Sequence, residues 1–413
     1  MAIVKPFCAV RPRSDIADQV AALPYDVYNR QEAREAVKGR PYSFLNIDRP
    51  ETQLDPEIDI YDDLVYQTAN RLLRKQIESG VFLQDRLPCY YIYELTMNGR
   101  SQTGIVGCAS VDDYETGVIK KHENTRADKE IDRIRHVDAC NAQTGPIFLA
   151  YRSRKDINSI VSEVKAEQKP VYDFISEDGI EHCVWRIANP VMIEELEDAF
   201  EHISNLYIAD GHHRAASAVK VGLGRRNEQQ DYTGNEEYNY FLSVLFPDDQ
   251  LHIMDYNRTV RDLNGYSKSE FIEKLKENFT VKEVGKEAYA PKEKHVFGMY
   301  LDSNWYELQI KRELIDEEDP VRSLDVALLQ DYLLKPILGI HDPKTDQRID
   351  FIGGVRGLKE LERRADADMR ISFSMYPTTI DELFAVADAD LLMPPKSTWF
   401  EPKLRSGLFI HLI

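Results

Sequence analysis

The sequence predicts an α/β or α+β fold in which a mixed sheet carries flanking helices. Short apolar runs typical of strands are interspersed with segments of helical spacing, but without a regular βαβ rhythm. The chain has 413 residues, a length that allows two or three domains. Hydrophobic residues make up 43% and charged residues 30%, which is the balance of a folded chain rather than a disordered one.

The first half of the chain contains a helix and a hairpin. Apolar residues at three- and four-residue steps predict a helix over residues 60–79. Residues 89–95 and 104–111 are rich in aromatic and β-branched side chains and predict two strands. Asn98 and Gly99 stand between them, and both residues tolerate the positive φ angles of a tight hairpin turn. Further along, we predict strands at 147–151 and 183–187 and a helix at 191–203.

The second half begins with a strand, a tight turn and a helix. Leu206 to Ala209 form a short apolar run, and the helical segment 215–221 follows closely and ends at Gly222. Additional strands are predicted at 238–246, 295–301, 305–310 and 370–376, and helices at 324–334 and 378–389. We place the domain boundary between residues 225 and 290 and take 1–250 and 251–413 as the two regions.

The charge balance and the cysteines exclude several classes of protein. With 52 basic and 71 acidic residues the net charge is −19, which repels a nucleic-acid backbone but leaves room for a small anion in a local basic site. Five cysteines without a C-x-x-C pair argue against a disulfide framework and a thiolate zinc site. No signal peptide and no apolar stretch of about 18 residues is evident. We expect a cytoplasmic protein with no nucleic-acid or membrane partner, which could form a homodimer.

The most specific feature is Asp210-Gly211-His212-His213-Arg214. The glycine lets the backbone turn sharply and approach a ligand. The following residues open a helix, whose N–H groups and positive dipole end attract anions. The arginine adds a planar fork that matches phosphate or carboxylate, the histidines offer donors or proton carriers, and the aspartate can bind a metal or accept a proton. The structural alternative is a helix cap beside a surface ion pair.

A second polar stretch runs from Lys120 to Thr125 and continues into a charged segment. Its cationic candidates for holding an anion are Lys121, His122, Arg126 and Arg133. Glu123 is a carboxylate among these cations and could take the proton of a substrate hydroxyl. The alternative is a solvated charged helix over 127–137 with opposite charges paired along its face.

Two other segments carry weaker features. Asp26 could line a pocket or form a simple Asx turn. The loop from Pro394 to Lys403 is expected to be structural, with Lys396 a lesser candidate for reaching a phosphate.

The sequence has no Walker A motif, no G-x-G-x-x-G after a strand and no G-x-S-x-G elbow. P-loop kinases, Rossmann dehydrogenases and α/β-hydrolases therefore lose their main support.

The stretch from Asp210 to Arg214 after an apolar strand resembles the signature of free-serine kinases, which share a superfamily with ParB nucleotidases and sulfiredoxins. The whole chain resembles a bacterial and archaeal family labelled domain of unknown function 1015. The matching segments include Lys5-Pro6-Phe7, Pro24-Tyr25-Asp26, His122-Glu123 with Thr125, Asp210 to Arg214, and Gly407 to His411. The resemblance implies a ParB/sulfiredoxin-like core with an additional C-terminal α/β domain.

The resemblance further implies a kinase-like phosphotransferase that acts on free L-serine and gives O-phosphoserine. The residues it implicates are catalytic Glu123, Asp210, His212 and His213; phosphate-binding Gly211, Arg214, Lys121 and His122; and substrate-binding Thr125, Arg126 and Arg133. It assigns a Mg²⁺ ion to Asp210. The donor would be ATP, ADP or inorganic polyphosphate or pyrophosphate, and no residue distinguishes them. Two other classes remain open: a ParB-like nucleotide-binding and hydrolysing regulatory protein, and a non-enzymatic metabolite sensor.

Overall fold

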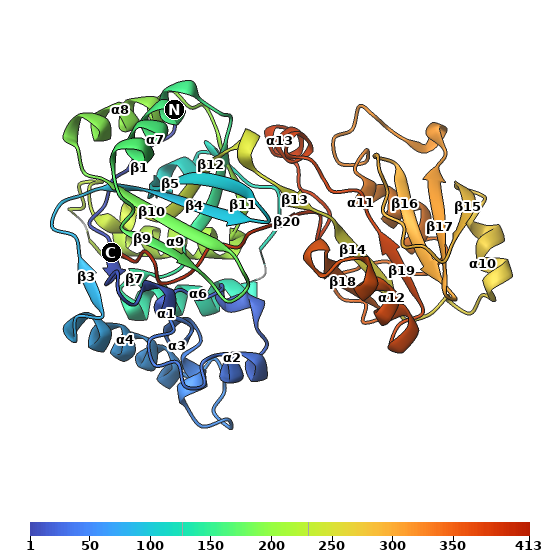
Figure 1. Ribbon diagram of the computed structural model, residues 1–413, viewed down its shortest axis with the longest axis horizontal. Coiled ribbons are helices and arrows are strands. Elements are labelled where there is room, and N and C mark those ends of the chain that lie inside the picture. Colours follow the sequence, from blue (N-terminus) through green and yellow to red (C-terminus); the bar gives the residue numbers. More distant parts are fainter. Residues whose placement is uncertain (126, 230) are drawn as a thin grey trace. The chain divides into compact units, whose positions relative to one another are not determined.

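The computed structural model describes residues 1–125, 127–229 and 231–413, and it divides into two compact units (Figure 1). Unit 1 comprises Met1–Leu251 and Pro402–Ile413, and unit 2 comprises His252–Glu401. The sequence-based division placed all of 251–413 in one region. The closing segment belongs to unit 1 because its backbone pairs there: Ile410 exchanges hydrogen bonds with Val10 at 2.9 and 3.0 Å.

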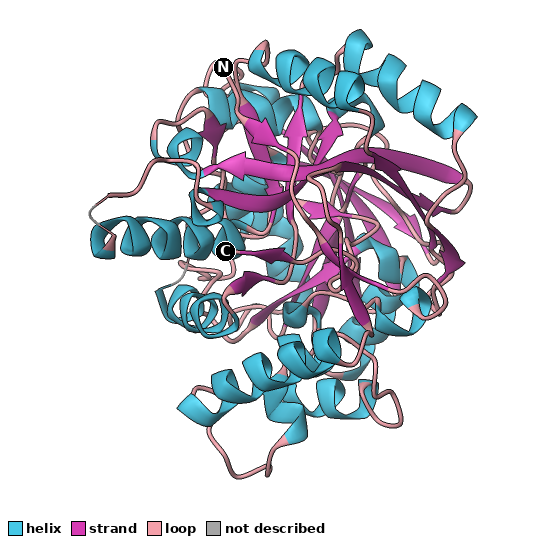
Figure 2. Ribbon diagram, turned by 90° about the vertical axis from the view of Figure 1, so that its left-hand side faces the viewer, coloured by secondary structure: helices cyan, strands magenta, loops and turns pink. Residues whose placement is uncertain are grey.

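Unit 1 confirms the predicted mixed sheet with flanking helices (Figure 2). The strand order is β6-β11-β8-β12-β5-β4-β10-β9, and β1 also pairs with β5. The strands are β1 (Val4–Lys5), β4 (Tyr90–Met97), β5 (Arg100–Ser110), β6 (Ile119–Lys120), β8 (Ile147–Tyr151), β9 (Tyr172–Ile175), β10 (Glu181–Ile187), β11 (Leu206–Asp210) and β12 (Tyr240–Pro247). Two pairs are parallel, β6 with β11 and β8 with β12. The strands β4, β5, β10 and β12 pair antiparallel.

Helices and short strand pairs surround this sheet. The helices are α1 (Ala17–Val20), α2 (Arg30–Ala36), α3 (Leu45–Asp48), α4 (Asp63–Glu78), α5 (Val111–Glu115), α6 (Ala127–Cys140), α7 (Lys155–Glu167), α8 (Pro190–Glu201) and α9 (His212–Glu228). The short strands β2 (Val10–Pro12) and β3 (Phe82–Gln84) pair with each other, as do β7 (Ala142–Gln143) and β21 (His411–Leu412). Helix α9 packs on the sheet through small buried residues such as Ala215 and Ala218, and α6 lies against α9.

Two local predictions have clear outcomes. The hairpin is confirmed: Asn98 and Gly99 have φ angles of 53° and 77° and join β4 to β5. The helix predicted to end at Gly222 instead continues to Glu228, so that prediction was wrong. Gly222 lies inside α9, where an added Cβ would come within 2.4 Å of the Tyr238 carbonyl oxygen. The glycine therefore allows a close backbone approach and does not end the helix.

Unit 2 contains an antiparallel sheet with the order β15-β17-β16-β19-β14-β18. Its strands are β14 (Tyr256–Val260), β15 (Phe279–Gly285), β16 (Val296–Leu301), β17 (Asn304–Ile310), β18 (Ile349–Gly353) and β19 (Ile371–Ser374), with the separate pair β13 (Ile253–Met254) and β20 (Trp399–Phe400). Its helices are α10 (Lys268–Leu275), α11 (Asp325–Leu329), α12 (Leu358–Ala367) and α13 (Ile380–Asp388). The predicted helix 324–334 is α11 followed by a π-helical turn, Gln330–Leu334.

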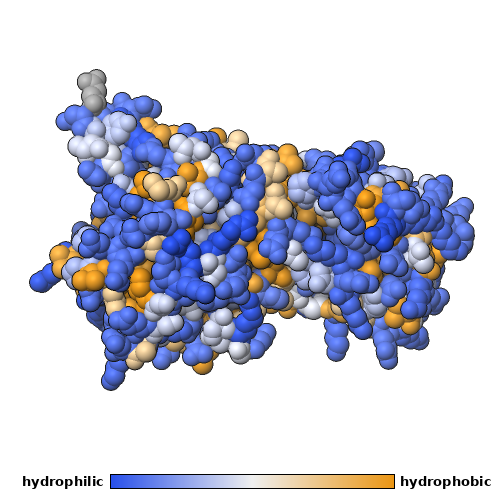
Figure 3. Space-filling view, turned by 90° about the horizontal axis from the view of Figure 1, so that it is seen from above, coloured by the Kyte–Doolittle hydropathy of each residue, from blue (hydrophilic) through white to orange (hydrophobic). Residues whose placement is uncertain are grey.

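The face of the molecule in Figure 3 is mostly hydrophilic, with apolar residues scattered among polar ones. Within the described residues, no helix is both long and apolar enough to cross a membrane.

Asp325 at the start of α11 makes the stability of unit 2 depend on pH. Burial raises the pKa of this carboxyl from 3.8 to about 7, although its Oδ1 accepts a hydrogen bond from His295 N at 2.9 Å. Because the folded state holds the proton more tightly than the unfolded chain, stability is greatest below pH 4 as far as this group is concerned and falls as the pH rises to about 7. Asp325→Asn should remove this fall and stabilise unit 2 at pH 8 by on the order of 2 to 4 kcal/mol.

Urea unfolding of wild type and Asp325→Asn at pH 5 and pH 8 would measure this effect. The control is Asp319→Asn, at a half-buried position where the wild-type carboxylate accepts hydrogen bonds from Val321 N and Arg322 N, and this variant should not gain stability at pH 8. An Asp325→Asn protein that is no more stable than wild type at pH 8 would contradict the prediction.

Candidate functional site

The parallel pairing of β6 and β11 brings the two polar stretches together. Leu206 is opposite Ile119 and Tyr207 is opposite Lys120, so both strands end at the same edge of the sheet. Just beyond this edge, His122 N lies 3.5 Å from His212 Nε2, and the two imidazole rings meet edge to face with centroids 4.5 Å apart. Residues that lie 90 positions apart in the chain therefore share one site.

The start of α9 has the geometry of an anion site. Gly211 has φ 94° and ψ 31°, the left-handed region that favours glycine, and the helix begins at His212. The N–H groups of the first helical turn have no acceptor within the helix and carry the positive end of its dipole. The prediction also assigned Gly211 N–H to the phosphates. That assignment is not supported, because this group donates to Asp210 Oδ1 at 2.9 Å.

Asp210 lies between two cations. Its Oδ2 is 3.4 Å from Lys403 Nζ and 3.7 Å from Arg214 Nη2. Burial alone would raise the pKa of this carboxyl. The positive charges of Lys403 and Arg214 outweigh that effect, and the pKa falls from 3.8 to about 2. The carboxylate is therefore charged at neutral pH and is a poor proton acceptor. It holds the lysine and the arginine beside the start of α9.

The surroundings of Asp210 also bear on the expected Mg²⁺ ion. Among the described residues, three potential ligand atoms from His, Cys, Asp or Glu come together at Asp173, Glu181 and Cys183, and Asp210 is not part of that group. Its Oδ2 faces two positive side chains, which would repel a bound dication. The residues present do not fit a Mg²⁺ site at Asp210, and we derive no step through a metal ion there.

The two contacting histidines are neutral. His122 and His212 are only 2% and 6% exposed. Burial lowers the pKa of His122 to about 4, and burial together with His122 lowers the pKa of His212 well below its ordinary value. Neither imidazole therefore offers a positive charge to a phosphate at neutral pH, although each can still donate a hydrogen bond. His213, on the same turn of α9, is half-buried.

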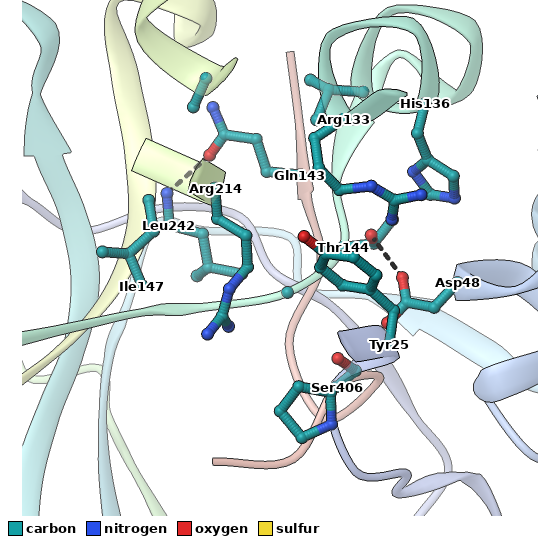
Figure 4. Close-up of a pocket in the computed structure, with 14 residues that line it drawn as sticks. Tyr25, Asp48, Arg133, His136, Gln143, Thr144, Ile147, Arg214, Leu242 and Ser406 are labelled. Atoms are coloured by element: carbon teal, nitrogen blue, oxygen red, sulfur yellow. Dashed lines mark hydrogen bonds between the residues drawn. The ribbon is translucent and has the colours of Figure 1, made fainter. Parts of the chain in front are cut away.

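Arg133 and Arg214 line one small cavity of about 30 Å³ (Figure 4). Arg214 reaches it from α9 and donates through Nη1 to the Pro146 carbonyl at 2.5 Å. Arg133 reaches it from α6, pairs with Asp132 at 2.8 Å and lies 4.0 Å from the centre of the Tyr25 ring. Because a single water molecule needs about 10–15 Å³ of cavity volume, the cavity accepts a group no larger than a carboxylate.

The other predicted residues of the first stretch have different surroundings. Thr125 Oγ1 donates to the carboxylate of Glu130, which also pairs with Lys220 of α9, so this hydroxyl anchors the stretch to two helices. Lys121 is exposed, and its Nζ lies 4.3 Å from the centre of the Tyr114 ring. Glu123 is half-buried and directly follows His122. Arg126 lies outside the described residues.

Two residues of the site were not predicted from the sequence. Lys403 stands in the loop that was expected to be structural, and nothing in its spacing connects it to Asp210, 193 positions earlier. Tyr25 lines the small cavity, whereas its neighbour Asp26, which we had considered for a pocket, is exposed. Lys396 belongs to unit 2, where its Nζ lies 5.7 Å from the centre of the Tyr256 ring.

The chain matches the model of a family described as "Protein of unknown function (DUF1015)" over residues 4–327, which is more than half of its length. It belongs to the DUF1015 family. This confirms the resemblance stated from the sequence. A comparison with curated proteins finds no match for this DUF1015 protein.

Several solved structures show low similarity to this DUF1015 protein. A glutamate-to-glutamine variant of a free serine kinase in complex with AMP is 15% identical, with 72% of this chain and 87% of that chain covered and a TM-score of 0.37. A conserved hypothetical protein from Pyrococcus furiosus is 16% identical, covering 75% and 95%, with a TM-score of 0.35. C-terminally truncated SbnI from Staphylococcus aureus is 12% identical, covering 74% and 87%, with a TM-score of 0.39. Scores this low do not decide the function of the chain.

Proposed function

We propose that the chain is a kinase-like phosphotransferase that moves a phosphoryl group from a nucleotide or an inorganic polyphosphate to the hydroxyl of free L-serine. The observation that carries the proposal is the parallel pairing of β6 with β11. It sets the stretch that contains Glu123 beside the anion-attracting start of α9. The resemblance of the stretch from Asp210 to Arg214 to free-serine kinases suggests the acceptor.

The donor phosphates would bind at the start of α9. The first-turn N–H groups, Lys403 and Arg214 all favour negative charge there, and Asp210 keeps both side chains in place. In a chain of net charge −19, such a local gathering of cations can attract the phosphates of a donor, whereas the net charge disfavours a nucleic-acid backbone.

The acceptor's carboxylate would bind in the small cavity between Arg133 and Arg214. Two guanidinium groups line this cavity, and its volume of about 30 Å³ suits a carboxylate but excludes a nucleotide. Arg214 would thus contact both substrates, since it also lies beside the start of α9. This arrangement would orient the serine hydroxyl toward the donor.

Glu123 would act as the general base in the transfer. The serine hydroxyl oxygen attacks the terminal phosphorus of the donor while its proton passes to the Glu123 carboxylate. A P–O bond to serine forms as the bond from that phosphorus to the bridging oxygen of the donor breaks. The bridging oxygen keeps the electron pair and leaves with the remaining phosphates. The neutral imidazoles of His122 and His212 would donate hydrogen bonds and carry no charge.

The test incubates the purified protein with L-serine and ATP, ADP, polyphosphate or pyrophosphate, with and without Mg²⁺, and measures O-phosphoserine by mass spectrometry. We expect phosphoserine from at least one donor. Ethanolamine, which is serine without its carboxylate, should be a far poorer acceptor. Loss of the donor without any dependence on serine would support the ParB-like hydrolase instead, and binding without turnover would support a sensor. Either result would overturn the serine-kinase proposal.

A further inference from the structure

The segment Pro24-Tyr25-Asp26 has no role in the reaction as written, although part of it lies at the small cavity. Pro24 and Tyr25 both line that cavity, whereas Asp26 is exposed. Tyr25 itself is only 9% exposed. Its ring is therefore part of the wall of the cavity that we assign to the carboxylate of serine.

The Tyr25 ring lies against the guanidinium of Arg133. The central carbon of that guanidinium is 4.0 Å from the ring centre, within the range of a cation–π contact (Figure 4). Burial raises the pKa of the Tyr25 hydroxyl to about 12, so the cation faces a neutral ring and not a phenolate. Arg133 is 7% exposed, and a cation–π contact is stronger when both partners are shielded from water.

Asp132 holds another side of the same guanidinium. Its Oδ2 lies 2.8 Å from both Nε and Nη2 of Arg133, and its Oδ1 accepts a hydrogen bond from the Tyr66 hydroxyl of α4 at 2.9 Å. Nη1 of Arg133 is not part of this ion pair. The carboxylate of Asp132 thus fixes one edge of the guanidinium, and the ring of Tyr25 covers one face.

The backbone that carries Tyr25 is anchored independently of Arg133. Arg49 Nη1 donates to the carbonyl oxygens of Tyr25 and Tyr28 at 2.9 and 2.7 Å, and Arg49 pairs with the buried Glu51 at 2.6 Å. The ring therefore stands on a fixed backbone. It can restrict the long Arg133 side chain, which otherwise has many rotamers to lose when it binds a ligand.

The charges of the lining agree with a carboxylate ligand. They are the guanidinium groups of Arg133 and Arg214 and one carboxylate, Asp48, whose Oδ1 accepts a hydrogen bond from Thr144 Oγ1 at 2.9 Å. A guanidinium that is already oriented binds a carboxylate at a lower entropic cost. We propose that Tyr25 is a positioning residue that holds Arg133 ready for the acceptor's carboxylate, so that the site selects acceptors that carry one. This inference rests on the proposed function and assigns its acceptor specificity.

The test compares Tyr25→Leu and Tyr25→Phe in the full chain, with L-serine and ethanolamine as acceptors. We expect Tyr25→Leu to raise KM for serine about tenfold with little change in kcat, and to leave the slow reaction of ethanolamine unchanged. Tyr25→Phe keeps the ring and should behave as wild type. The matched control is Tyr28→Leu, a half-buried position in the same segment that does not line the small cavity, and it should keep the wild-type KM.

Calorimetry of serine binding without a donor gives a second readout that does not need turnover. Tyr25→Leu should bind serine about tenfold more weakly than wild type does. If Tyr25→Leu does not fold, Tyr25→Met, which keeps a long apolar side chain without a ring, takes its place.

The outcomes separate this inference from the proposed function. An unchanged KM and unchanged serine binding in Tyr25→Leu would overturn the role of Tyr25 and leave the kinase proposal standing. An equal loss of activity with serine and ethanolamine would show general damage to the site and would also overturn that role. If wild type binds serine but forms no phosphoserine, the kinase proposal fails and calorimetry still decides the role of Tyr25. A wild-type protein that binds no serine would overturn both.

Discussion

Replacing Arg214 with alanine is expected to lower kcat/KM for serine phosphorylation by about 10²–10³-fold, which corresponds to roughly 3 kcal/mol or more of transition-state stabilisation. Arg214 lines the small cavity and also lies 3.7 Å from Asp210 at the start of α9. Its loss would remove a positive charge that both substrates contact, at the point where the phosphoryl group moves between them. The measurement is the initial rate of phosphoserine formation at varied serine and donor concentrations.

Two further variants make this prediction specific. Arg214→Lys keeps the charge but loses the planar fork, so it should recover part of the activity. Arg225→Ala changes an arginine on the same helix that pairs with Asp138 at 3.2 Å and does not line the small cavity. It should retain wild-type activity. An Arg214→Ala enzyme with wild-type turnover would reject the proposed role of Arg214.

The sequence predicted those parts of the fold that depend on local chemistry. The hairpin at Asn98-Gly99 follows from the φ preferences of two residues, and the strand 147–151 follows from a short apolar run; both are confirmed. The extent of α9 could not be predicted from the sequence. Gly222 allows the close approach of the Tyr238 carbonyl, and only the tertiary fold brings that carbonyl near. For the same reason the C-terminal segment could not be placed in unit 1 without knowing that Ile410 pairs with Val10.

The candidate site likewise has features that the sequence could predict and features that it could not. Gly211 and the helix after it were predictable from adjacent residues, since a strand, a glycine and a helix form one local unit. Lys403 was not, because its contact with Asp210 spans 193 positions. Nor could the charge of the histidines be inferred: His122 and His212 are neutral because they are buried against each other, which only the pairing of β6 with β11 produces. The predicted roles of the site residues remain predictions until the variants are measured.

The lowered pKa values of His122, His212 and Asp210 make these three groups weak bases, and Glu123 is our candidate base. Glu123→Gln should lower kcat by about 10²–10⁴-fold with little change in the affinity for the donor, because the amide keeps the shape of the side chain but cannot accept the serine proton. The control is Glu115→Gln, an exposed position in α5, which should behave as wild type. Donor affinity is measured by calorimetry and turnover by phosphoserine formation. If Glu123→Gln loses donor binding together with turnover, Glu123 helps to shape the site instead of taking the proton, and if it keeps turnover, another group is the base.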